Sequence, residues 1–202
     1  MVPKTIKAVI FDCGNVLCRV ENEHIKRDIS STLAVDIRTV ERLWERFVPL
    51  LGKNKINELE FWKIFLKKSG GKKPLPKESL FIREFRKRYK VYDSVIKIVY
   101  QLKKKGIKLA ILSNNITPQV KFLTSKGLFK PFDIKIFSNE VGVQKPDKKM
   151  YLLALKRIRA RPQETIFVDD RLIHVEAAKK LGINGILFQN AKQLKKDLIK
   201  FK

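Results

Sequence analysis

Short, largely apolar runs recur along the chain, and each of them stops at a polar residue. Runs of four or five residues are typical of strands buried on both faces, as in a parallel sheet. The five runs occupy residues 7–11, 108–112, 134–137, 165–168 and 185–188. We therefore predict five buried strands.

Between the later runs, the apolar positions follow a helical spacing instead. In residues 94–105 they recur every three or four positions and stop at Gly106, and a glycine there is typical of a helix C-terminus. Similar patterns predict helices at 118–126, 147–159 and 173–181. Alternating strands and helices form parallel sheets with helices on both faces. The predicted fold class is therefore α/β, with a three-layer α/β/α, Rossmann-like parallel sheet.

The stretch between the first strand and the helix at 94–105 contains no run typical of a strand. Its spacing predicts four helices, at residues 23–34, 37–51, 58–69 and 77–89. Asn57 and Glu60 are placed to cap the third of these helices. We predict a core formed by residues 1–17 and 91–202, with an inserted all-helical cap at residues 18–90.

The chain is strongly basic, because 45 Lys and Arg against 20 Asp and Glu give a net charge of +25. Such a field attracts nucleic acid, other polyanions and small anionic substrates. The alternative is a generic basic surface, and no zinc-finger spacing or RNA-binding strand motif favours a nucleic-acid site. The first apolar run is too short for a signal peptide or a membrane span. Cys13 and Cys18 give no disulfide framework, which favours a cytoplasmic protein. We also expect no membrane partner, and either a monomer or a homodimer.

Three aspartates follow the predicted strands at the edge where parallel sheets bind ligands. Asp12 comes directly after the first strand, and Asp169 and Asp170 come after the fourth. An aspartate in this position can attack phosphorus and form an aspartyl-phosphate. Since that attack brings two anions together, a divalent cation is needed, and a few carboxylates suit Mg²⁺. We predict that these three residues bind Mg²⁺ and that Asp12 is the nucleophile.

Three further polar residues lie at the same predicted edge. Ser113 and Asn114 follow the second strand, and Lys145 precedes Pro146 after the third. The first two can donate hydrogen bonds to a phosphoryl group, and the lysine can neutralise charge that develops in the transition state. Each residue alone is a weak signal, and their order on successive strands carries the prediction.

In this order, the motifs resemble those of the haloacid dehalogenase superfamily: D-x-[D/G/Y], [S/T]-N, K-P and D-D. The helical insertion resembles the small helical cap of one subgroup, and the loop Asp12-Cys13-Gly14-Asn15-Val16 resembles the D-x-G-N-V loop of sugar-phosphate phosphatases. The resemblance implies that the carbonyl of Gly14 joins Asp12, Asp169 and Asp170 as a metal ligand. It also implies catalytic roles for Asp12 and Lys145, with Ser113, Asn114 and Lys145 binding the phosphoryl group.

Two positions depart from the family pattern. Gly14 stands where most phosphatases of the family carry the aspartate that protonates the leaving group, a contribution of roughly 10²–10⁴-fold. His174 stands where the family often has asparagine. We expect His174 to support a loop, the alternative being that it partly replaces the missing acid.

The sequence thus predicts a Mg²⁺-dependent phosphatase of small phosphorylated metabolites, with sugar phosphates as one candidate class. One alternative is a metal-independent 2-haloacid dehalogenase, which would leave Asp169 and Asp170 without an evident role. Another is a catalytically weak member that binds RNA or another polyanion through its basic surface.

Overall fold

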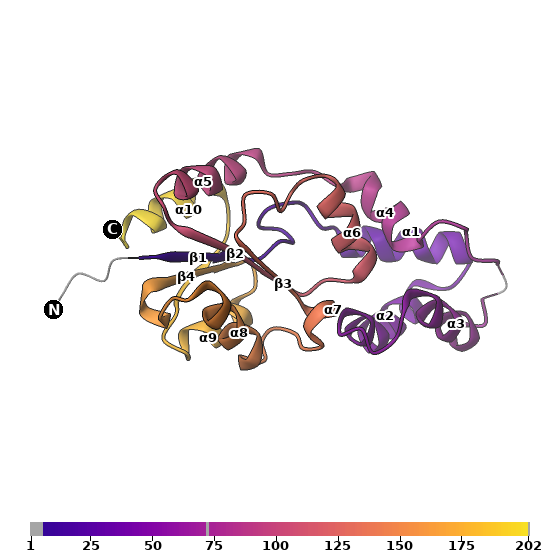
Figure 1. The fold of residues 1–202 in the computed structure, drawn as a ribbon. Helices are drawn as coiled ribbons and strands as arrows, with labels where there is room; N and C mark the ends of the chain where they lie inside the picture. The colour runs from indigo at the N-terminus through magenta and orange to yellow at the C-terminus, as the bar shows by residue number, and fades with distance from the viewer. Residues whose placement is uncertain (1–5, 72, 202) are drawn as a thin grey trace.

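Five parallel strands form one sheet in the computed structural model, which describes residues 6–71 and 73–201. The strand order is β3-β2-β1-β4-β5, so β1 lies in the centre between β2 and β4 (Figure 1). Every predicted strand is present within one residue of its predicted bounds. The strands are β1 (Ala8–Phe11), β2 (Lys108–Ser113), β3 (Ile134–Phe137), β4 (Thr165–Asp169) and β5 (Asn184–Leu187).

Helices cover both faces of the sheet, which confirms the predicted three-layer α/β/α fold. Helices α5 (Asp93–Lys104) and α10 (Ala191–Ile199) lie on one face, and α8 (Lys148–Ile158) and α9 (Leu172–Lys179) on the other (Figure 1). Alternate residues of β1 enter the two separate apolar cores, as the strand period of two requires. The helix α10 was not predicted.

Four helices fill the stretch between β1 and α5. They are α1 (Asn22–Leu33), α2 (Ile37–Gly52), α3 (Glu58–Ser69) and α4 (Leu80–Arg88). The predicted capping pair is confirmed, because Glu60 N donates to Asn57 Oδ1 (2.9 Å) and Asn57 N donates to Glu60 Oε2 (2.8 Å). Helix α4 begins three residues later than predicted, at a cap where Ser79 Oγ accepts from Ile82 N (3.2 Å).

The chain passes between the sheet and the four helices in two adjacent segments. Cys18 pairs with Val91 in an antiparallel bridge, and Tyr92 N donates to Leu17 O (2.9 Å). Two helices from the sheet's edge also reach the inserted helices: α6 (Thr117–Ser125) contacts α4, and the short, unpredicted α7 (Ser138–Val141) contacts α2. The domain boundaries at residues 18 and 90 stay a prediction. Within the described part of the chain, no helix has the length and apolar character needed to cross a bilayer.

Candidate active site

Three carboxylates meet where the two central strands end. Asp12 directly follows β1, and its N–H donates to Val168 O on β4 (2.8 Å). Because β1 and β4 are in register there, Asp12 lies beside Asp169 at the end of β4. Asp12, Asp169 and Asp170 can each offer an oxygen such that all three lie within 4.8 Å of one another. The strand order therefore brings together the three carboxylates that are predicted to bind the metal.

A buried lysine lies against two of these carboxylates. Lys145 is 3% exposed, and its Nζ lies 2.9 Å from Asp12 Oδ1 and 2.6 Å from Asp169 Oδ2. Burial lowers the pKa of Lys145, but the two carboxylates outweigh burial and hold that pKa above its ordinary value. Lys145 therefore carries its charge at neutral pH.

The two buried aspartates respond to their surroundings in opposite directions. Burial raises the pKa of Asp12 despite the nearby Lys145, and the charge of Asp169 adds to the rise. Burial also acts on Asp169, but its contacts with His174 and Lys145 outweigh burial and hold its pKa below the ordinary value. Of these two buried aspartates, Asp12 is therefore the one that is harder to ionise.

The set of donors fits a divalent cation. Lys145 supplies one positive charge, paired with Asp12 and Asp169, against the three carboxylates of the cluster. The remaining negative charge is costly to bury unless another cation compensates it. A hard cation among three carboxylates would do so, and this ligand set is typical of Mg²⁺ sites.

Ser113, the last residue of β2, and Asn114, which follows it, have different surroundings. Ser113 is buried and lines the same cavity as Asp12. Asn114 also lines this cavity, but its side chain holds the loop that carries Lys145: Nδ2 donates to Lys145 O (2.9 Å), and Oδ1 accepts from Lys145 N (2.8 Å). The amide of Asn114 thus fixes the position of the lysine. That Ser113 and Asn114 donate to a phosphoryl group stays a prediction.

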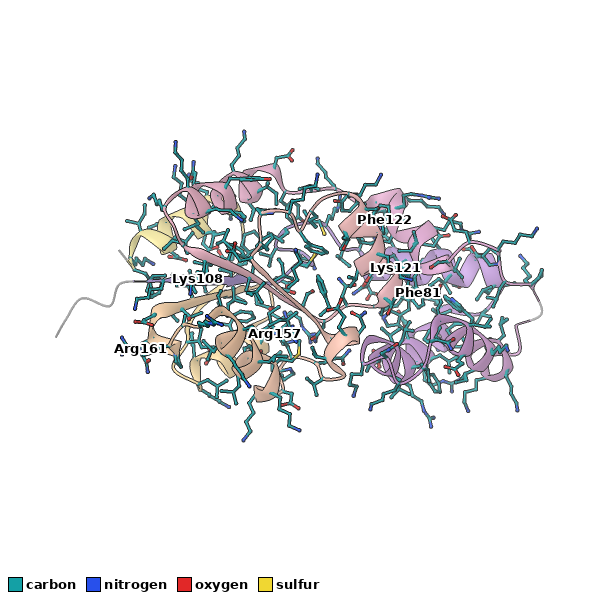
Figure 2. All side chains as sticks on the ribbon, viewed as in Figure 1. Phe81, Lys108, Lys121, Phe122, Arg157 and Arg161 are labelled. Carbon is teal, nitrogen blue, oxygen red and sulfur yellow. The ribbon has the colours of Figure 1, made fainter. Side chains whose placement is uncertain are left out.

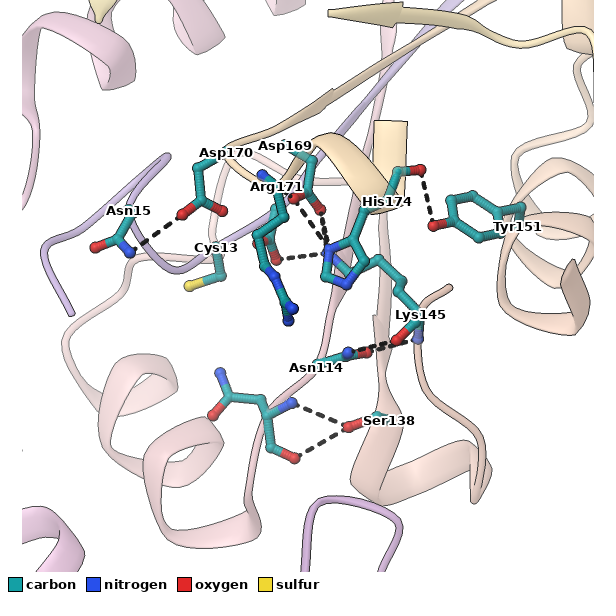
Figure 3. A network of polar contacts seen from close by, with 12 residues as sticks. Cys13, Asn15, Asn114, Ser138, Lys145, Tyr151, Asp169, Asp170, Arg171 and His174 are labelled. Carbon is teal, nitrogen blue, oxygen red and sulfur yellow. Dashed lines mark hydrogen bonds and ion pairs between the residues drawn. The ribbon is translucent and has the colours of Figure 1, made fainter. Parts of the chain in front are cut away.

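His174 supports the buried aspartate of β4. Its Nδ1 lies 3.0 and 3.1 Å from the two carboxylate oxygens of Asp169, and its carbonyl accepts from the hydroxyl of Tyr151 (3.0 Å; Figure 3). The N–H of Arg171 adds a further hydrogen bond to Asp169 Oδ1 (2.9 Å). This geometry agrees with a supporting role for His174.

We expect His174→Leu to weaken Mg²⁺ binding by about 10- to 100-fold, a typical effect of losing a group that orients a metal ligand. His174→Asn, which keeps a polar group near Asp169, should recover most of the affinity. Isothermal titration of each variant with Mg²⁺ measures the change. Equal Mg²⁺ affinity in His174→Leu and the wild type would contradict a role for the histidine in orienting Asp169.

Asn15 is a part of the site to which the sequence assigned no role. Its Nδ2 donates to Asp170 Oδ2 (3.2 Å), and its Oδ1 accepts from Val20 N (3.0 Å). Its backbone is left-handed (φ 56°), a conformation that asparagine tolerates better than most residues. The sequence shows an asparagine directly after Gly14, but it does not show that this side chain binds Asp170, the residue that follows β4.

The space beside Gly14 is filled by a neighbouring side chain. A Cβ added at Gly14 would lie 3.3 Å from Val20 Cγ2. An acidic side chain there would require Val20 to shift. Gly14 itself has no side chain, so the loop provides no acid at the position where most phosphatases of the haloacid dehalogenase superfamily have one.

Comparison with known families agrees with this geometry. The family model described as haloacid dehalogenase-like hydrolase matches residues 6–182. The chain belongs to this family. The resemblance deduced from its motifs is thereby confirmed, and the protein is a hydrolase of the haloacid dehalogenase (HAD) type.

The proteins that resemble this HAD-like hydrolase in sequence include phosphatases, and a solved structure of another HAD enzyme has a similar fold. A glyceraldehyde 3-phosphate phosphatase of Methanopyrus kandleri is 26% identical over 93% of this chain and 85% of its own. A phosphorylated carbohydrates phosphatase of Thermotoga maritima is 39% identical over 42% of this chain, which spans only 40% of that relative. A HAD family enzyme of Bacteroides thetaiotaomicron, crystallised with magnesium and inorganic phosphate, superposes with a TM-score of 0.77 at 17% identity, covering 92% of this chain and 95% of its own.

Proposed function

We propose that this HAD-like hydrolase cleaves small phosphate monoesters in a Mg²⁺-dependent reaction, with Asp12 as the nucleophile. The observation that carries the proposal is the cluster of Asp12, Asp169 and Asp170 around the buried Lys145 at the end of β1 and β4. The phosphatases among its relatives support the same reaction.

The carboxylates of Asp12, Asp169 and Asp170 and the carbonyl of Gly14 would hold the cation. Bound Mg²⁺ would stabilise negative charge on the phosphoryl oxygens. Lys145 would add a second positive charge at the same place, since its Nζ already lies beside Asp12. Ser113, which lines the cavity, would donate a hydrogen bond to the phosphoryl group.

The reaction would proceed in two displacements at phosphorus. In the first, a carboxylate oxygen of Asp12 forms a bond to phosphorus while the bond to the ester oxygen breaks, and the departing alcohol takes a proton from water because Gly14 supplies none. In the second, water attacks the aspartyl-phosphate, the Asp12–phosphorus bond breaks, and inorganic phosphate leaves. Lys145 would favour the ionised form of Asp12 in the first step, because its charge lowers the pKa that burial raises.

The substrate class is a small phosphorylated metabolite, and sugar phosphates are the first candidates. The relative from Methanopyrus kandleri is described as a glyceraldehyde 3-phosphate phosphatase, and that from Thermotoga maritima as a phosphatase of phosphorylated carbohydrates. The helices α1 to α4 would then close over the bound ester and exclude bulk water.

The test is release of inorganic phosphate from a panel of sugar and aryl monophosphates with Mg²⁺ and, separately, with excess EDTA. We expect turnover that is lost in EDTA and returns when Mg²⁺ is added back. Halide release from 2-haloacids in the presence of EDTA would instead favour the dehalogenase alternative. Turnover of neither class would contradict the proposed function.

A further inference from the structure

The space for the leaving group lies between the carboxylates and the inserted helices. A cavity of about 320 Å³ is lined by Asp12, Ser113 and Asp170 on the side of the sheet and by residues of α1, α2 and α4 on the opposite side. A phosphoryl group bound to Asp12 would occupy the first side. The rest of the ester must therefore face the second side, which we call the roof.

The roof is apolar. Its main side chains are Ile25, Trp44, Val48, Pro49, Phe81 and Phe85. Phe81 packs against Trp44 with ring centroids 5.5 Å apart, so these rings present a shared aromatic surface. Among the described residues of the insertion that line the cavity, none carries a charge.

The absence of charge on the roof contrasts with the composition of the insertion. Residues 61–90 contain eleven Lys or Arg against two Glu. Figure 2 shows Phe81 among the helices of the insertion, whereas many nitrogen-tipped side chains point outward from the molecule. Several of the basic residues of α4 are paired with acidic groups, among them Arg88 with Asp28 (2.6 Å) and Arg86 with Glu78 (2.9 Å). The basic surface of the insertion is therefore separate from the cavity.

Among the described residues, the charged groups that line the cavity lie on the side of the sheet. They are Asp12, Asp170 and Arg171, and the imidazole of His174 lines the cavity on the same side. Arg171 follows the two aspartates directly, and Figure 3 shows its side chain extending from the strand end that carries them. A charged group of the ester that faces the roof would meet no charged partner there, and burying an unpaired charge is strongly unfavourable.

From this division we infer that the leaving group of the substrate is uncharged and presents an apolar face to α2 and α4. The inference rests on the proposed function and narrows its substrate class. Esters whose only charge is on the phosphoryl group fit the cavity, whereas those with a carboxylate or a second phosphate on the leaving group do not. The selection arises on the roof, at Trp44, Val48 and Phe81.

Two aryl esters of nearly the same shape differ in the charge of the group opposite the phosphate: 4-carbamoylphenyl phosphate and 4-carboxyphenyl phosphate. We expect kcat/KM to be at least about tenfold higher for the carboxamide, because the carboxylate would be buried without a partner. The assay is run with Mg²⁺ at 0.15 M salt, where the Debye length of about 8 Å limits attraction by the distant basic surface.

A variant that adds a positive charge to the roof tests where the selection arises. Val48 lines the cavity on α2, and Val48→Lys should reduce the preference for the carboxamide severalfold or reverse it. Glu45→Gln is the matched control, since it changes the net charge by the same amount at an exposed position of the same helix outside the cavity lining. It should leave the ratio of the two kcat/KM values unchanged.

The outcomes separate this inference from the proposed function. Equal or faster turnover of the carboxylate by the wild type would overturn the inference and leave the phosphatase function intact. A ratio that does not change in Val48→Lys, or that changes equally in Glu45→Gln, would overturn the assignment of selection to the roof. If the wild type hydrolyses neither these two esters nor any other phosphate ester, the proposed function fails and this inference fails with it.

Discussion

Asp12→Asn is expected to lower kcat on the best phosphate ester by at least about a thousandfold, because removing a nucleophile abolishes the covalent route. The asparagine amide is nearly the same size as the carboxylate but cannot form an aspartyl-phosphate. The measurement is phosphate release at saturating Mg²⁺, with quenched samples of the wild type analysed by mass spectrometry for a phosphorylated peptide that contains residue 12.

The same substitution should preserve or increase stability at pH 7 in the absence of metal. Burial raises the pKa of Asp12 in the folded state. A raised pKa contributes stability that is present below the ordinary value and is lost as pH rises through the folded value. The ionised Asp12 therefore destabilises the fold at neutral pH, and the neutral amide removes this effect. Urea unfolding in EDTA should show a gain at pH 7 that shrinks on acidification.

Asp93→Asn is the control for activity, because Asp93 is exposed and lies outside the lining of the cavity. It should keep nearly all of the wild-type kcat. Substantial turnover by Asp12→Asn, with no phosphorylated peptide in the wild type, would contradict the nucleophile role. A folded but inactive Asp12→Asn variant together with an active Asp93→Asn variant is the expected pair of results.

The strands were predictable because each is a short apolar run with a polar end, a pattern that depends only on local sequence. Two α-helices of the described residues were not predicted. The four residues of α7 are too few to show a helical period, and α10 is interrupted by lysines and has only Leu194 fully buried. The start of α4 was placed too early because Lys77 and Glu78 are compatible with a helix, while the cap at Ser79 is set by its bond to Ile82.

The site could be predicted as a set of residues but not as a set of contacts. An aspartate after a strand indicates a place at the sheet edge, and this applies to Asp12 and Asp169 alike. That these two strands are neighbours depends on the chain topology, which the apolar pattern does not specify. Asn114 binds the backbone of Lys145, 31 residues away, and Asn15 binds Asp170, 155 residues away. Neither partner can be read from the local sequence.

Lys145→Met should reduce both activity and stability. We expect kcat to fall by roughly 10²–10³-fold, since a positive charge beside the phosphoryl group is lost. The free energy of unfolding at pH 7 should fall by roughly 3–5 kcal/mol, which is typical when one partner of a buried ion pair is removed. Methionine is similar in length, so the change tests the charge at Asp12 and Asp169. Phosphate release and urea unfolding in EDTA measure the two effects.

The loss of stability should depend on pH in a definite direction. Lys145 helps to hold the pKa of Asp169 low, and a lowered pKa contributes stability that is present above the ordinary value and is lost as pH falls through the folded value. It also limits the rise of the pKa of Asp12. Without Lys145, both carboxylates become harder to ionise. The variant therefore loses most stability at the pH values at which these carboxylates are charged. The difference from the wild type should therefore be largest near pH 7 and shrink as pH falls towards the ordinary aspartate value of 3.8.

This pH dependence separates charge from packing. Lys148→Met provides the control, because Lys148 is exposed at the start of α8 and its replacement should change neither stability nor its pH profile appreciably. If Lys145→Met loses the same free energy at pH 4 and at pH 7, the loss comes from packing around the side chain and not from its ion pairs. A loss confined to neutral pH would mean that Lys145 is retained to keep Asp12 and Asp169 ionised together in a buried site, which is the condition that both the nucleophile and the metal ligands require.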